Sequence, residues 1–77
     1  MKQHLEYNDL QRAAIRVFES KERIARQKAL IAALKDSGLP TKEAIAELER
    51  FERSLLAMQY HRVILSDLLK RDPYSRS

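Results

Sequence analysis

The sequence contains no cysteine, and only one glycine and two prolines among its 77 residues. The absence of cysteine excludes disulfides and thiolate metal sites and is typical of a reducing, cytosolic compartment. No apolar run approaches the roughly 20 residues needed to span a bilayer, and the first residues lack the apolar stretch of a signal peptide. We therefore expect a cytoplasmic protein without a membrane segment.

Patterns that carry catalysis or bind metals are also scarce. The two histidines, His4 and His61, lie far apart in the sequence and show no metal-ligand spacing. The residues three and four positions from His61 are all apolar, so no nucleophile or carboxylate lies within helical reach of it. The Glu-x-x-His pattern of di-metal helical bundles is absent. We expect no enzyme activity, no cofactor and no metal.

The residues that are present favour helices. Hydrophobic residues make up 44% of the chain and charged residues 34%, with strong helix formers prominent among both. The length allows one small domain, and a chain of this size buries only about 60% of the surface that its unfolded form exposes. Small domains gain stability from disulfides, metals or oligomerisation. Because no disulfide and no metal site is expected, oligomerisation is the remaining source of added stability.

One break divides the chain. Gly38 adopts a left-handed conformation freely and is typical of the residue just past a helix end, where Leu39 folds back onto Leu34. Pro40 cannot continue the helix, and Thr41 can cap a second one. These signals predict helix one over about 8–37, a turn over 38–40, and helix two over about 41–71. The tail 72–77 is expected to fray, and residues 1–7 extend the helix or form an arm.

Apolar residues recur at alternating spacings of three and four, which predicts a coiled-coil seam along both helices. A turn at Gly38 brings together residues whose numbers add to about 79, and the two seams then coincide. The fold prediction is all-α: a two-helix antiparallel hairpin. On helix one the seam positions are Leu10, Ala13, Val17, Ser20, Ile24, Gln27, Ile31 and Leu34, and on helix two they are Leu48, Phe51, Leu55, Met58, Arg62, Leu65 and Leu69.

Arg62 is the charged member of this seam, and its guanidinium is too costly to bury without a partner. One interpretation is that its aliphatic stem packs in the seam while its head reaches solvent or a carboxylate. The alternatives are a buried polar layer that sets the register, or a role in ligand binding.

A second apolar stripe remains once the seam is filled. Because helix two is apolar on more than one face between Leu55 and Leu69, it should be covered on more than one face. This predicts a homodimer in which two hairpins form a four-helix bundle, or a surface for another protein. The expected oligomer interface consists of Ile15, Phe18, Leu56, Tyr60, Val63 and Ile64.

Net positive charge lies mainly on helix one: seven basic and four acidic residues occur between Asn8 and Ser37, against six basic and five acidic residues between Thr41 and Arg71. Nucleic-acid binding calls for a basic patch largely free of acid. Arg12, Arg16, Arg23 and Arg26 form a loose stripe, but Glu19 lies inside it. Non-enzymatic protein–protein interaction through self-association is therefore the leading hypothesis. A nucleic-acid-associated factor that uses this basic face is the alternative.

Three segments carry a resemblance to a known family. They are Glu22-Arg23-Ile24-Ala25-Arg26-Gln27, the turn Ser37-Gly38-Leu39-Pro40-Thr41, and Phe51-Glu52-Arg53-Ser54-Leu55 with His61-Arg62. Over residues 19–69 the chain resembles a set of short alphaproteobacterial helical-hairpin proteins. The resemblance implies no activity, cofactor or catalytic residue.

Overall fold

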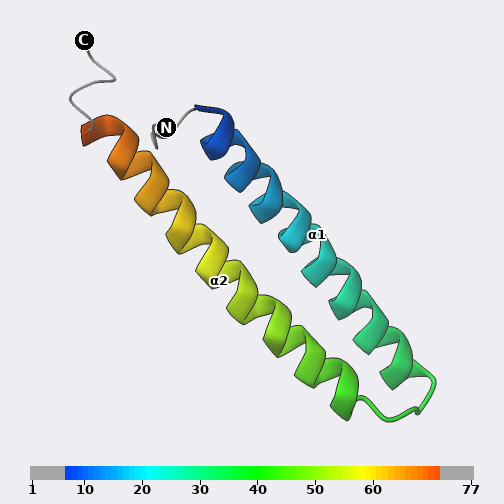
Figure 1. Cartoon of the computed structure of the whole chain (residues 1–77). Helices are drawn as coiled ribbons and strands as arrows, with labels where there is room; N and C mark the ends of the chain where they lie inside the picture. The colour runs from blue at the N-terminus through cyan, green and yellow to red at the C-terminus, as the bar shows by residue number, and fades with distance from the viewer. Residues whose placement is uncertain (1–6, 72–77) are drawn as a thin grey trace.

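The structure, a computed structural model, describes residues 7–71 as two α-helices, α1 (Tyr7–Asp36) and α2 (Lys42–Arg71). The helices lie side by side and antiparallel, joined by a short turn (Figure 1). Each has 30 residues, which corresponds to a length of about 45 Å. The all-α hairpin is confirmed, and each helix begins and ends within one residue of the expected position. Expectations about residues 1–6 and the tail 72–77 lie outside the described residues.

The turn ends α1 with a Schellman motif. The amide of Leu39 donates to the carbonyl of Leu34 at 2.8 Å, and the amide of Gly38 donates to that of Lys35 at 3.0 Å. Gly38 has a φ of 71°, in the left-handed region that this motif requires. The backbone bonds of the turn therefore follow from the glycine that the sequence places there.

Replacing Gly38 by alanine tests this conformational requirement. A Cβ at this position would meet no atom within 4 Å, so alanine would cost only backbone strain. We expect a loss of about 1 kcal/mol in the free energy of unfolding, and a smaller loss for Gly38→Asn, because asparagine tolerates left-handed geometry better. Urea denaturation of the three proteins measures both differences. Equal stability of the alanine variant and the parent would contradict the assignment.

Helix α2 begins directly after Thr41, whose carbonyl accepts a hydrogen bond from the amide of Ile45 at 2.9 Å. Thr41 therefore holds the capping position expected for it. Glu43 adds a negative charge to the first turn, where it complements the helix dipole. At the other end, Arg71 forms an ion pair with Asp67 at 2.8 Å, but both side chains are exposed, so the pair stabilises the helix only slightly.

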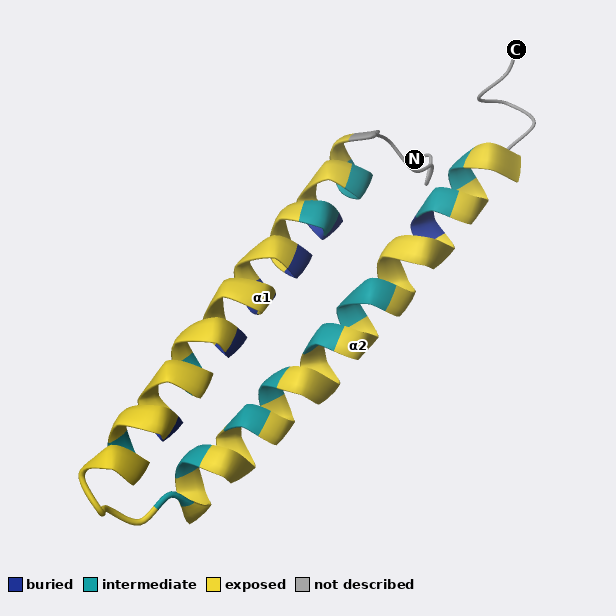
Figure 2. Cartoon of the chain, turned by 180° about the vertical axis from the view of Figure 1, so that it is seen from behind, coloured by how far each residue is buried: buried dark blue, intermediate teal, exposed yellow. Residues whose placement is uncertain are grey.

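The core of the hairpin is a single seam between the helices. Buried and half-buried positions follow the inner edges of α1 and α2, and most of the outer surface is exposed (Figure 2). Among the described residues no large side chain is fully buried. A two-helix layer covers each helix on one side only, so this hairpin has a thin core. The buried residues are Ala13, Val17, Ser20, Ile24, Ile31 and Leu65.

Two side-chain contacts join the helices near the turn. The side-chain amide of Gln27 donates to the carbonyl of Ala44 at 2.9 Å, and the guanidinium of Arg23 lies over the ring of Phe51, 5.6 Å from its centroid. The numbers in these pairs add to 71 and 74, below the expected 79. Long side chains on a helix lean toward its N-terminus, which for α1 is away from the turn. This lean brings them to higher-numbered residues of α2, so it would raise the totals and cannot explain the lower ones. The lower totals therefore reflect a displacement of the helices relative to the predicted register.

Arg62 is exposed, although the seam spacing places it on the inner side of α2. Its neighbours Gln59 and Ser66 are half-buried instead. Exposure lets the guanidinium remain hydrated, which avoids the cost of burying a charge. The alternative of a buried polar layer at Arg62 is therefore wrong, and the exposed head agrees with the first interpretation.

Candidate functional site: two opposite faces of the hairpin

The seam divides the rest of the surface into two flanking faces. Successive residues of a helix are turned by about 100° around its axis. Because α1 and α2 run in opposite directions, a step forward from the seam on either helix turns to the same side of the hairpin. Residues that directly follow seam residues therefore share one face, and residues that directly precede seam residues share the opposite face.

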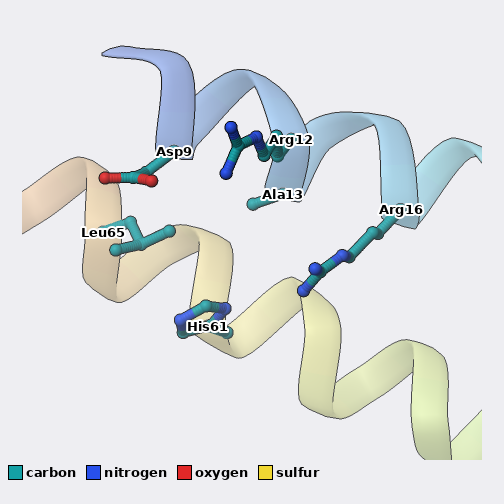
Figure 3. A pocket seen from close by; sticks show the side chains of 6 residues that line it. All are labelled: Asp9, Arg12, Ala13, Arg16, His61 and Leu65. Atoms are coloured by element: carbon teal, nitrogen blue, oxygen red, sulfur yellow. The ribbon is translucent and has the colours of Figure 1, made fainter. Parts of the chain in front are cut away.

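The face of the preceding residues is basic, and we call it the arginine face. A shallow cavity of about 320 Å³ lies on it, lined by residues of both helices (Figure 3). Its polar side chains directly precede the seam positions 10, 13, 17 and 62, which confirms that these positions of α1 and α2 converge. In Figure 3 the side chain of Arg16 extends from α1 toward α2. The cavity residues are Asp9, Arg12, Ala13, Arg16, His61 and Leu65.

The expected nucleic-acid residues all lie on the arginine face, but they do not form a continuous free cationic surface. Arg12 and Arg16 line the cavity together with the carboxylate of Asp9. Arg23 is stacked on Phe51, and Arg26 is exposed. Glu19 precedes the seam residue Ser20 and so lies among them. Cationic charge on this face is divided by acidic side chains, which weakens its attraction for a phosphate backbone.

The face of the following residues carries large exposed apolar side chains, and we call it the Phe18 face. Phe18 on α1 is 61% exposed, and Leu56 and Val63 on α2 are 67% and 63% exposed. Each directly follows a seam position, so the three lie on one side of the hairpin, from its middle (Leu56) toward the end away from the turn (Phe18 and Val63). Large exposed apolar side chains on one face of a molecule are typical of an interaction surface.

The other residues of the expected interface are exposed but point elsewhere. Tyr60 lies two residues from the seam positions on either side of it, and so occupies the outer surface of α2 beside the Phe18 face. Ile15 has the same position on the outside of α1. Ile64 lines a shallow hollow on the outer side of α2 together with Val63, Ser66, Asp67 and Lys70. The structure therefore brings three of the six predicted residues to one face.

Charged residues complete the Phe18 face from the middle of the hairpin toward the turn. Lys21 and Lys28 follow seam residues on α1, whereas Glu49 and Glu52 follow seam residues on α2. One side of this face is therefore positive and the other negative. Sequence analysis missed this arrangement, although the position of each residue relative to the seam carries the signal. Between the lysines and beside them lie small exposed or half-buried residues: Ala14, Ala25 and Ala32.

Neither face offers a metal site among residues 7–71, where no three potential ligands are grouped closely enough to hold an ion. Neither described helix is both long and apolar enough to cross a membrane. Comparison of the chain with family models, curated proteins and solved structures finds no match. The resemblance to alphaproteobacterial hairpin proteins therefore stays a prediction, and the faces of the hairpin carry the functional argument.

Proposed function

We propose that the chain is a non-enzymatic cytoplasmic protein that acts through protein–protein interaction, and that it first associates with a second copy of itself. In the proposed homodimer two hairpins pack through their Phe18 faces and form a four-helix bundle. The observation that carries this proposal is the exposure of Phe18, Leu56 and Val63 on a single face of a hairpin with a thin core.

The energetics support self-association. Complete burial of a side chain such as phenylalanine, leucine or valine contributes roughly 1.5–3 kcal/mol. A symmetric dimer removes three such side chains of each chain from water, a contribution on the order of 10 kcal/mol, which equals the stability of a typical domain. A hairpin that buries only one seam gains most from a partner that covers a second face. A second copy of the hairpin supplies such a partner, because it carries the same apolar face.

Nucleic-acid binding remains the alternative function, and the geometry favours it less. Its four candidate arginines share a face, as expected, but Glu19 and Asp9 lie on the same side. The apolar side chains of the Phe18 face find no role in that function, whereas a dimer covers them and leaves the arginine faces outward. Self-association therefore accounts for more of the surface.

Sedimentation equilibrium tests the proposal directly. At micromolar concentration the chain should sediment near 18 kDa, twice its 9.0 kDa mass. Its melting temperature, followed by far-UV circular dichroism, should rise with protein concentration because association is linked to folding. A folded 9.0 kDa species with the same melting temperature at every concentration would contradict self-association.

A further inference from the structure

We propose, building on the homodimer above, that the two hairpins associate with their turns at the same end of the bundle. The proposed occupant of the Phe18 face is thus a second copy, related by a two-fold axis parallel to the helices. In this arrangement α1 of each chain packs against α2 of its partner and runs antiparallel to it. The inference concerns the orientation of the partner, which the proposed function alone leaves open.

The first argument is the uneven distribution of apolar residues along the Phe18 face. Phe18 and Val63 lie in the half of the hairpin away from the turn, and Leu56 lies at its middle. When both turns are at the same end, the apolar half of one chain covers the apolar half of the other. With the turns together, the partner's α2 lies at the same level along the bundle as α2 of the first chain. Phe18 of the first chain therefore lies at the level of Leu56 and its neighbours on the partner's α2.

Charge complementarity between the middle of the hairpin and the turn also favours the arrangement with the turns together. With the turns together, α1 of one chain faces α2 of the other, so Lys21 lies at the level of Glu52 of the second copy, and Lys28 lies within about one helical turn of its Glu49. All four side chains are exposed in the single chain, and in the part that the structure describes they form no ion pair. Close pairs of opposite charge orient a partner, and pairs of like charge reject the wrong one.

The other two-fold arrangement places the turns at opposite ends and fits the same face poorly. In it α1 would lie on α1 of the partner, and α2 on α2, each running in the opposite direction. The level of Val63 would then fall near residue 50 of the partner's α2, so that Val63 would lie beside Glu49 and Glu52. Burying carboxylates against an apolar side chain is costly, and the lysines of α1 would find no acidic partner.

Spin labelling distinguishes the two orientations, and the absence of native cysteine makes a single label unambiguous. A nitroxide on Ser37→Cys marks the turn, and one on Asn8→Cys marks the opposite end; both positions are exposed. With the turns together, each variant should give a pulsed dipolar distance between the two chains below about 30 Å, since packed helix axes lie about 8–10 Å apart. Turns at opposite ends would separate the labels by about 45 Å or more, the length of one helix.

Sedimentation of the same labelled samples separates the two levels of the proposal. A dimer with a short distance at both positions supports the orientation. A dimer that gives a long distance at either labelled position, with or without a short distance in the same sample, contradicts the proposed orientation. Self-association itself would then still hold. A monomer without a dipolar signal overturns both. Each label is also measured after dilution with excess unlabelled chain, where a short distance between chains must disappear.

Discussion

Replacing Phe18 by aspartate should abolish the dimer at micromolar concentration. The side chain is 61% exposed in the single hairpin, so the change costs the isolated chain little packing. In the dimer it removes a buried ring and places a carboxylate against the partner, at a cost of about 3 kcal/mol or more at each of two symmetric positions. At 1.4 kcal/mol for each tenfold change, the dissociation constant should rise by about four orders of magnitude. Sedimentation equilibrium over a range of concentrations measures this change.

Leu30→Asp provides the matched control. Leu30 is also a large exposed side chain in α1, but it precedes the seam residue Ile31 and therefore lies on the arginine face. Both variants place aspartate in the interior of the same helix, so they share its low helix propensity. The control should retain a dissociation constant within about tenfold of the parent. If Leu30→Asp dissociated the dimer while Phe18→Asp did not, the arginine face would be the interface.

Local chemistry made the turn predictable from the sequence. A Schellman motif needs a left-handed residue, and Gly38 is the only glycine in the chain. The motif forms between residues at most five positions apart, so no knowledge of the second helix is required. The structure places both characteristic hydrogen bonds, from Gly38 and from Leu39, where the sequence suggests. The seam was predictable for a similar reason, because the spacing of apolar residues along each helix determines which side is buried.

Contacts between the helices were harder to predict, because they depend on the displacement of one helix along the other. The 3–4 spacing repeats with every turn, so it tolerates sliding and determines the register only approximately. The stacking of Arg23 on Phe51 and the hydrogen bond from Gln27 to Ala44 show the actual displacement. Neither contact has a sequence signal, since both join long side chains to residues in the opposite helix.

The predicted interface mixed residues of different faces for a separate reason. Ile15 and Ile64 were matched by their level along the hairpin, and both do lie in the half away from the turn. Level along the hairpin does not determine direction around the helix, and direction separates Ile15 on the outer surface from Phe18 on the flank. The number of residues between a position and the nearest seam position gives its direction around the helix from the sequence alone. The same count places Lys28 and Glu49, which carry opposite charges, on the Phe18 face.

Replacing Val17 by aspartate should prevent folding altogether, in contrast to the interface variant. Val17 is 3% exposed and lies in the seam of a hairpin with few buried residues. An unpaired carboxylate there would cost about 4 kcal/mol or more, a large part of the stability of a small domain. We expect the far-UV circular dichroism of a helix to be lost, together with association, at all accessible concentrations.

The osmolyte trimethylamine N-oxide separates a damaged seam from a damaged interface, because it favours compact states without contributing a contact. Phe18→Asp retains the complete seam, so any helical signal that it loses on dissociation should return with added osmolyte while the chain remains monomeric. Val17→Asp should regain neither helix nor dimer. Ala29→Asp, on the exposed outer surface of α1, controls for aspartate within the helix and should fold and associate like the parent. A helical dimer of Val17→Asp would show that the seam between α1 and α2 contributes little, and that the helices are held together by other contacts.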